Sequence, residues 1–237
     1  MRCWRPNSVP CRPPASGFTL IELLVVMAII SVLLLMTLPV LHCMRTLGRQ
    51  MACASRLRDI AVGWHAYLSD NDQRFYQEVN ANHDFGGWKG TAGGPPHRAL
   101  NKYVGLPMES NGPGGTGLFR CPADQGDEDY GPQAYIYFGN SYQTNLMLVG
   151  PDSLPTGVPE PLRGLNRKIN ANLKDLKADR VCEPTRLLLL GDNNWITQWD
   201  PLIPVPGRPW HDREGRYNMA FLDGHVDFIS ICKSVYI

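Results

Sequence analysis

The sequence predicts an α+β fold: a long N-terminal helix, whose first half spans a membrane, packs on a small, mostly antiparallel β-sheet head. Long loops and a C-terminal β-hairpin complete the head. Three observations predict this. An apolar run over residues 18–41 contains one charged residue. Apolar residues spaced by three and four continue from it to about residue 69. Near the C-terminus, two alternating stretches flank an Asp-Gly pair, which is typical of a hairpin.

The charge and length of the chain limit the kinds of partner and the number of domains to expect. The chain has 237 residues and a net charge of +1, which gives no reason to expect a nucleic-acid partner. Residues 1–16 contain Arg2, Arg5 and Arg12 and no acid. A basic segment before an apolar run is typical of a targeting signal whose basic end stays in the cytoplasm. The rest of the chain is long enough for one domain with a core.

The apolar run is long enough for a membrane span. Its 24 residues would form about 36 Å of helix, against a bilayer core of about 30 Å. No A-x-A cleavage pattern follows it, so we expect a single-pass anchor and not a secretory signal that is removed. Glu22 lies near its start, and an acid within lipid is costly unless it has a partner.

The stretch "GFTLIELLVVMAII" resembles the N-terminal signature of type IV pilin-like proteins, which include type IV pilins and the pseudopilins of type II secretion systems. The resemblance implies that a prepilin peptidase cuts between Gly17 and Phe18 and then N-methylates Phe18. Glu22 then occupies mature position five, where the family has its acid. Pro39 occupies mature position 22, where pilins often have a helix-kinking proline.

The resemblance also implies partners. These are the prepilin peptidase, other pilin-like subunits in a homo- or hetero-filament, a secretion assembly platform and the membrane. In a filament, the Glu22 carboxylate can meet the N-terminal amine of a neighbouring subunit's Phe18. Pairing offsets the cost of each charge among apolar helices and sets the axial register.

Four segments follow from these interpretations. Residues 1–17 are a cleaved leader, 18–41 a transmembrane or filament-core helix, 42–69 its amphipathic continuation, and 70–237 an exported head with a hairpin at about 216–230. We expect the anchor in the inner (cytoplasmic) membrane and the head in the periplasm or at the cell surface. We expect Trp64 and Tyr67 to contact the core of the head. The apolar stripe of the second segment consists of Leu47, Met51, Ala54, Leu57, Ala61, Trp64 and Leu68.

The head is predicted to be rich in loops, with short strands at 134–138, 145–149 and 186–190. Asp223-Gly224 is expected to form a two-residue type I′ turn. That turn pairs Phe221 with Val226 and Met219 with Phe228. One face of the hairpin would then carry Tyr217, Met219, Phe221, Val226 and Phe228, and His225 and Asp227 would lie on the other.

A second resemblance lies at this hairpin. "PWHDREGRYNMAFLDGHV" is similar to the C-terminal element of a prepilin-type processing-associated family, in which nine residues separate a His from Asp-Gly. The motif residues here are His211, Asp223 and Gly224. Eleven residues separate His211 from Asp223 in this chain, so a fixed contact between the two is not assumed.

Metal binding receives little support from the sequence. His211, Asp212, Asp223, His225 and Asp227 can be read as ligands, but turn geometry and a solvated face explain them more simply. Calcium is the one cofactor to consider, because the resemblance implies it: major pseudopilins bind Ca²⁺ in a C-terminal loop, and oxygen ligands suit that ion. The candidate ligands are Asp124, Asp127, Asp129, Asp192 and Asp223.

The seven cysteines contain no C-x-x-C pair. Cys53 and Cys121 are candidate disulfide partners that would tie the helix to the head; two unrelated buried thiols are the alternative. The sequence contains no G-x-S-x-G, H-E-x-x-H or P-loop motif, so we expect no enzyme.

Two functions remain. The first is a pilin-like structural subunit that is processed by prepilin peptidase and assembled into a type II secretion pseudopilus or a type IV pilus-like filament. The alternative is a membrane-anchored, exported module that binds a glycan or protein. The surface for such binding would be the loops around Trp88, Trp195, Trp199 and Trp210.

Overall fold

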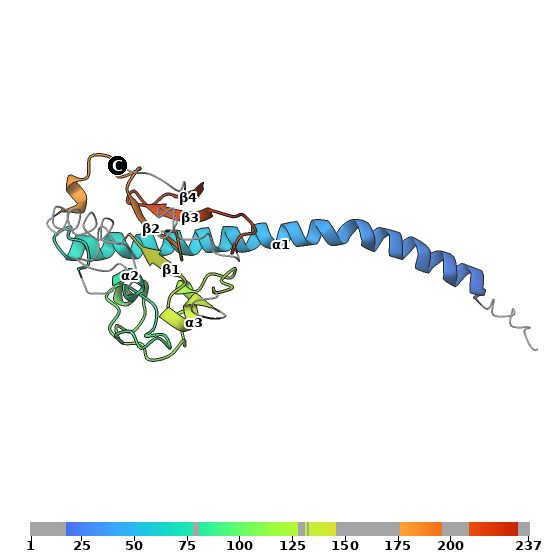
Figure 1. Cartoon of the computed structure of the whole chain (residues 1–237), viewed down its shortest axis with the longest axis horizontal. Coiled ribbons are helices and arrows are strands. Elements are labelled where there is room, and N and C mark those ends of the chain that lie inside the picture. Colours follow the sequence, from blue (N-terminus) through green and yellow to red (C-terminus); the bar gives the residue numbers. More distant parts are fainter. Residues whose placement is uncertain are drawn as a thin grey trace, which may run out of the picture. The chain divides into compact units, whose positions relative to one another are not determined.

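The computed structural model describes residues 18–77, 81–127, 131, 133–145, 176–195 and 209–231. The chain divides into two compact units, Met1–Met44 and Arg45–Ile237, which are treated separately. One helix, α1 (Leu20–Asp70), contributes to both units (Figure 1).

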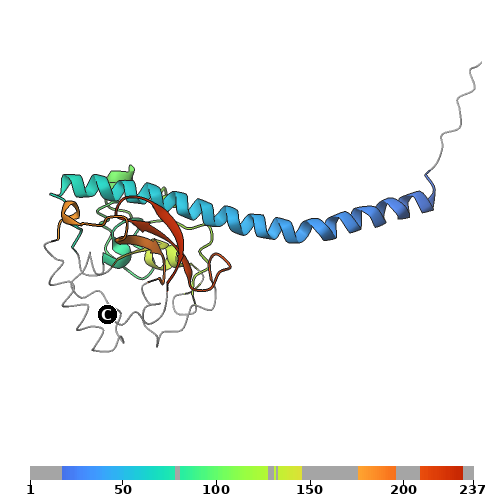
Figure 2. The same cartoon turned by 90° about the horizontal axis from the view of Figure 1, so that it is seen from above.

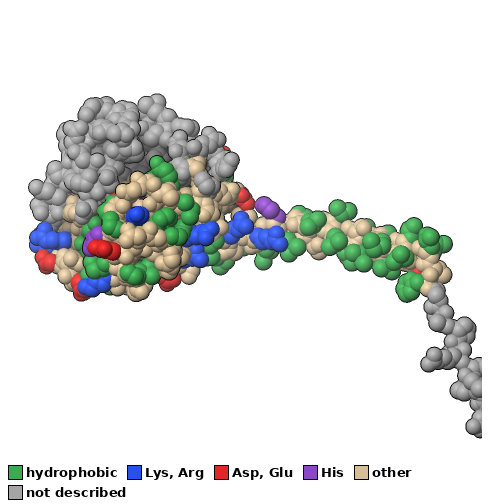
Figure 3. Space-filling model, turned by 90° about the horizontal axis from the view of Figure 1, so that it is seen from below, with side chains coloured by type: hydrophobic (Ala, Val, Ile, Leu, Met, Phe, Trp, Pro, Cys, Tyr) green, Lys and Arg blue, Asp and Glu red, His purple; other side chains and the backbone are tan. Residues whose placement is uncertain are grey.

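In the first unit, α1 is apolar on all sides. Its large apolar side chains are exposed around the whole circumference, from Leu20 at 79% to Val40 at 59%, and they cover this part of the helix in Figure 3. An 18-residue window of α1 has a mean hydropathy of 2.8, so the helix is long and apolar enough to cross a membrane. Pro39 lies inside α1, and the helix continues past it although proline has no N–H to donate to the preceding turn.

In the second unit, one stripe of α1 forms a wall of the core. The predicted residues Leu57, Ala61, Trp64 and Leu68 are buried, and Tyr67 packs against the same cluster. Leu47 and Met51 are exposed, which the spacing alone did not indicate. The full set of buried α1 residues is Cys53, Leu57, Ile60, Ala61, Gly63, Trp64 and Leu68.

A four-stranded antiparallel sheet packs on this stripe (Figures 1 and 2). Its strands are β1 (Tyr142–Thr144), β2 (Leu188–Asp192), β3 (Arg216–Phe221) and β4 (Val226–Ser230), in the order β1-β2-β3-β4. Ala220 belongs to the main core with the α1 stripe, whereas its neighbour Met219 joins Trp195 and Tyr217 in a second cluster. Successive strand residues point to opposite faces, so the sheet has apolar residues on both faces. The predicted α+β class and the C-terminal hairpin are confirmed.

Short helices connect these elements. They are α2 (Ala81–Asp84), α3 (Ala134–Phe138) and the 3₁₀ turns η1 (Asn101–Val104), η2 (Gly117–Phe119) and η3 (Ala178–Arg180). The strand predicted over 134–138 is wrong, because those residues form α3. The Asp124 carboxylate accepts hydrogen bonds from the backbone N–H groups of Ala134 and Tyr135, at 2.9 and 2.8 Å. An acid at that position stabilises a helix start.

Two other strand predictions are shifted. β1 ends at Thr144, just before the predicted strand at 145–149, of which residues 146–149 lie outside the described residues. β2 begins two residues later than predicted and extends to Asp192. The strand therefore carries a carboxylate into the buried end of the sheet.

The hairpin exists where it was predicted, but its register is wrong by one residue. Ala220 pairs with Val226, and Met219 pairs with Asp227, so Val226 and Phe228 lie on the opposite face from Met219. The turn has three residues: Phe221 donates its N–H to the His225 carbonyl at 3.0 Å, and Gly224 donates to the Phe221 carbonyl at 2.9 Å. A type I′ turn needs positive φ at both central residues. Gly224 has φ +89°, whereas Asp223 is not among the residues with positive φ.

The core beside α2 contains buried polar groups. His83 donates through Nε2 to the Asn193 Oδ1 atom at 2.7 Å, and its ring stacks on Phe138 with 4.0 Å between centroids. Arg98 is fully buried and donates to the Asp84 carboxylate at 2.6 Å and to the His83 carbonyl at 3.0 Å. Burial lowers the pKa of His83 to about 4; the hydrogen bond to Asn193 opposes this lowering, and the nearby Arg98 charge adds to it.

We expect the head to lose stability between pH 6.5 and 4. His83 is neutral in the folded state until about pH 4, whereas in the unfolded chain it takes up a proton near pH 6.5. The unfolded state therefore binds more protons in this window. The free energy of unfolding should fall on acidification by about 3 kcal/mol. Urea unfolding followed by tryptophan fluorescence at several pH values measures this loss.

His83→Gln should flatten the dependence, because glutamine does not titrate. His65→Gln, which changes an exposed histidine of α1, is the matched control and should keep the wild-type dependence. Equal pH slopes in wild type and His83→Gln would contradict the assignment.

Candidate functional site

The start of α1 is closed by a reciprocal pair of side chains. Thr19 donates from both its backbone N–H and its hydroxyl to Glu22 Oε2, each at 2.8 Å. Glu22 in turn donates its backbone N–H to the Thr19 hydroxyl at 3.2 Å. This is a capping box, in which two residues three apart satisfy N–H groups that the first turn of a helix leaves unpaired.

The capping box gives Glu22 a role within its own chain. Its carboxylate also keeps the capacity to bind a cation, because a carboxylate offers about four acceptor positions. Phe18, four residues before Glu22 in the chain, is 82% exposed. Gly17 lies outside the described residues. The predicted processing residues therefore stand directly before a capped helix start with an exposed acid.

In the second unit, α1 is bound covalently to the head. Cys53 of α1 and Cys121 form a disulfide with 5.2 Å between their Cα atoms, across 68 residues of sequence. Both residues are buried, at 0% and 1% exposure. The alternative of two unrelated buried thiols is not what the structure contains. Cys43 and Cys182 are exposed and free.

A buried acid, imidazole and amide lie beside this disulfide. Asp192, the last residue of β2, accepts three hydrogen bonds at Oδ2: from the Asn218 backbone N–H at 2.8 Å, from the Asn218 side-chain amide at 3.0 Å, and from His211 Nε2 at 2.9 Å. Asp192, His211 and Asn218 are 1–3% exposed. Buried polar groups are tolerated when they are paired in this way.

Neighbours on both sides hold His211 in place. Trp210 donates its indole N–H to the Gly126 carbonyl at 3.3 Å, in the loop that follows Cys121. Asp212 accepts a hydrogen bond from the Thr46 hydroxyl of α1 at 2.7 Å. The segment around His211 is therefore fastened to the two parts of the head that also supply the cysteines.

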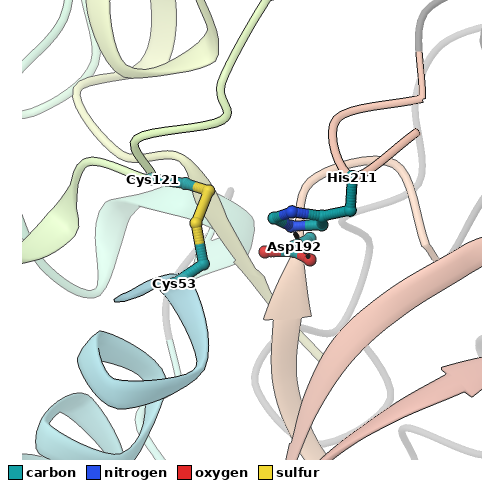
Figure 4. A group of neighbouring side chains, drawn as sticks. All are labelled: Cys53, Cys121, Asp192 and His211. Atoms are coloured by element: carbon teal, nitrogen blue, oxygen red, sulfur yellow. Dashed lines mark hydrogen bonds and ion pairs between the residues drawn. A yellow bond between two sulfur atoms is a disulfide. The ribbon is translucent and has the colours of Figure 1, made fainter. Parts of the chain in front are cut away.

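The result is a compact cluster of four chemically distinct side chains. Cys53, Cys121, Asp192 and His211 each offer one ligand atom, and these atoms lie within 4.8 Å of one another. Figure 4 shows the imidazole and the carboxylate side by side and facing the disulfide. Within the described part of the chain, no other set of three or more potential ligand side chains converges in this way.

The two halves of the His…Asp-Gly element have different partners. His211 pairs with Asp192, whereas Asp223 pairs with His225 across the hairpin turn, through the ring at 2.6 Å and the backbone N–H at 3.1 Å. Burial acts to raise the pKa of Asp223, but the hydrogen bonds from His225 outweigh it and leave that pKa below its ordinary value. The element thus supplies one buried residue and one exposed turn.

The calcium candidates do not form a common site in the described residues. Asp124 is already occupied: besides the α3 amides, it accepts from the Gly126 N–H at 3.0 Å and the Ser141 hydroxyl at 2.6 Å. Asp127 accepts from Asn194 at 2.8 Å. Asp129 lies outside the described residues. Asp192 and Asp223 have the separate partners given above. The alternative set of His211, Asp212, Asp223, His225 and Asp227 does not converge either.

The tryptophans proposed as a binding surface do not form one among the described residues. Trp88 and Trp195 are 7% and 0% exposed, and their indole N–H groups donate to the carbonyls of Tyr135 and Gln143 at 3.0 and 3.1 Å. Trp210 is partly buried, and Trp199 lies outside the described residues. The three described side chains, Trp88, Trp195 and Trp210, belong to or pack against the core of the head.

Sequence reasoning missed Asn218 and the pairing of Asp192 with His211. One signal was present: "LLLLGD" places an acid at the end of an apolar strand, where a carboxylate needs a partner. Which residue would meet it depends on how β2 pairs with β3, and the sequence analysis predicted no register for that pair.

Removing the Cys53–Cys121 disulfide should lower the free energy of unfolding of the head by about 2–4 kcal/mol, because the bond closes a long loop. Urea unfolding with a chelator present, before and after reduction, measures the loss. The double variant Cys53→Ala/Cys121→Ala should show it without reductant and respond to reductant no further.

Cys182→Ser, which removes an exposed free thiol, is the control and should behave like wild type. An unchanged unfolding free energy after reduction of the wild-type protein would contradict a stabilising bond.

Comparison with known protein families gives one match. Residues 12–38 match the model of the prokaryotic N-terminal methylation motif. Neither the comparison with curated proteins nor that with solved structures finds a match. The matched segment contains Gly17, Phe18 and the capped start of α1. The match and the long apolar helix support a type IV pilin-like, membrane-anchored protein that is processed at its N-terminus.

Proposed function

We propose that this protein is a structural subunit that prepilin peptidase cleaves between Gly17 and Phe18 and that then assembles into a type II secretion pseudopilus or a type IV pilus-like filament. The observation that carries the proposal is the methylation motif at residues 12–38, which overlies a helix with exposed apolar side chains on every side. The protein acts by assembly and not by catalysis.

The surface of the first unit supports assembly. A helix that is apolar all round needs an apolar environment on all sides. A bilayer provides it before assembly, and a bundle of like helices provides it afterwards. The exposed residues from Leu20 to Leu41 can therefore pass from lipid to neighbouring subunits without meeting water.

Charge supports the same proposal. Cleavage before Phe18 creates a new amine, and Glu22 keeps free acceptor positions beyond its capping box. The amine of one subunit can pair with Glu22 of the next, which offsets the cost of both charges and sets the register. The arginines of residues 1–16 would hold the leader in the cytoplasm, so the head is exported across the inner membrane.

The capping role of Glu22 can be separated from its charge by substitution. Glu22→Gln keeps a residue that can close a capping box but removes the charge. We expect it to insert and to be cleaved normally, and to enter filaments at least about tenfold less than wild type, because the partner amine is left without its counter-charge. Mass spectrometry of the mature N-terminus measures cleavage, and the amount of subunit in sheared filaments measures assembly.

Thr19→Ala is the matched variant. It weakens the cap and keeps the Glu22 charge, so it should assemble far better than Glu22→Gln. Normal assembly of Glu22→Gln would remove the charge pair from the proposal, and equal defects in both variants would assign Glu22 to the cap alone.

A further inference from the structure

The cluster beside the disulfide has the chemistry of a transition-metal site. Two cysteine sulfurs, one imidazole and one carboxylate are the donor types that Zn²⁺ binds in proteins, with four ligands in a tetrahedron. All four residues are at most 3% exposed, and they come from four separate parts of the head: α1, the loop at Cys121, the end of β2 and the segment before β3.

The geometry is close to what a metal requires. Tetrahedral zinc with Zn–S of about 2.3 Å and Zn–N or Zn–O of about 2.0 Å places its ligand atoms about 3.3–3.8 Å apart. The four ligand atoms here lie within 4.8 Å of one another with the disulfide closed. Cleavage of the disulfide separates the sulfurs, and the hydrogen bond between His211 and Asp192 opens so that both side chains can bind one ion.

Two buried atoms in the cluster have no hydrogen-bond partner among the described residues: Asp192 Oδ1 and His211 Nδ1. His211 donates through Nε2 to Asp192 Oδ2, so a neutral ring has its lone pair on Nδ1. A lone pair that is buried and unpartnered is costly. Each side chain therefore keeps one acceptor atom that the described residues around it leave unsatisfied.

The surroundings resemble the outer shell of a metal site. Carboxylates that ligate a metal are themselves hydrogen-bonded. Asn218 supplies two hydrogen bonds to Asp192 Oδ2, at 2.8 and 3.0 Å. These contacts hold the carboxylate and the ring in one orientation.

We propose that the reduced form of the protein binds one zinc ion through Cys53, Cys121, His211 and Asp192. The disulfide and the metal are then alternative cross-links between α1 and the rest of the head. A dithiol reductant gives two electrons and two protons to the disulfide, which becomes two thiols, and is itself oxidised to a disulfide; zinc then displaces the two thiol protons. A disulfide-forming oxidant takes up two electrons from the thiolates, closes the S–S bond and releases the zinc. This inference does not depend on filament assembly.

A small pocket lies beside the cluster. Asp192 and His211 line it, together with Trp210, Arg213 and Tyr217.

The test uses the full chain in detergent, with Cys3, Cys11, Cys43, Cys182 and Cys232 replaced by serine. A water-soluble phosphine reduces the disulfide, with water as the oxygen source for the phosphine oxide that forms, and a chelator removes metal before both reagents are washed out. Zinc is then titrated in competition with a chromophoric chelator. We expect one tightly bound zinc per reduced chain, none per oxidised chain, and release of about two protons on binding.

Co²⁺ in place of zinc reports the ligands directly. The reduced protein should show the intense visible bands of tetrahedral cobalt and a thiolate-to-cobalt charge-transfer band, and reoxidation should abolish both. Absence of these bands, or octahedral cobalt, would overturn the proposal.

Single substitutions separate the ligands from their surroundings. Asp192→Asn and His211→Gln should each weaken zinc binding more than about 100-fold, and Asn218→Ala about 10–100-fold. The exposed pair Asp223→Asn and His225→Gln has the same residue types outside the cluster and should leave affinity unchanged. Near-UV circular dichroism of each oxidised variant shows that it is folded.

Two results would overturn the inference: no zinc uptake by the reduced wild-type protein, or wild-type affinity in both Asp192→Asn and His211→Gln. The second would mean that the two thiols hold the metal by themselves.

Discussion

The head is built on the buried stripe of α1. The strands β1 to β4 contain only three to six residues each, and so small a sheet cannot bury a core without a helix against it. Trp64 and Leu57 provide that surface, and Cys53 fixes α1 to the loop at Cys121 at the start of the stripe. The contacts of β2 and β3, and therefore the buried cluster at Asp192 and His211, depend on this wall.

The same helix has two different surfaces because its sequence changes pattern near residue 45. Up to Met44, leucine, isoleucine and valine occupy every face, and their side chains are exposed. Beyond Arg45, arginine and other polar residues occupy most of the exposed surface of α1, and one apolar stripe is buried against the head. A helix of the first kind is stable only in lipid or among similar helices, whereas the second needs one folded partner. The proposed assembly and the folding of the head thus use different stretches of α1.

The sequence predicts an element well where an apolar pattern repeats many times, as in α1. It predicts poorly where a single residue determines the local backbone or a distant contact. The apolar run and the three-four spacing indicated α1, although the exposure of Leu47 depends on where the head ends. The hairpin register depended on the backbone of Asp223, which alternation does not reveal. α3 forms where aromatic residues favour a strand, because Asp124, ten residues away, binds its first amides. The contact of Asp192 with His211 could not be predicted because it depends on strand pairing and joins residues that are distant in the sequence.

Glu22 has a local partner as well as a proposed partner in a neighbouring subunit, so the two roles must be distinguished. An acid near the start of an apolar helix is costly without a partner, and another subunit can supply one. The capping box lowers the need for such a partner, because Thr19 already donates two hydrogen bonds to the Glu22 carboxylate and accepts one from the Glu22 N–H. A glutamine closes the same box without a charge, so capping alone gives no reason for an acid at this position. Glutamate differs from glutamine here by one negative charge, set four residues from the amine that the proposed cleavage would create, and that charge is the reason to propose the pair.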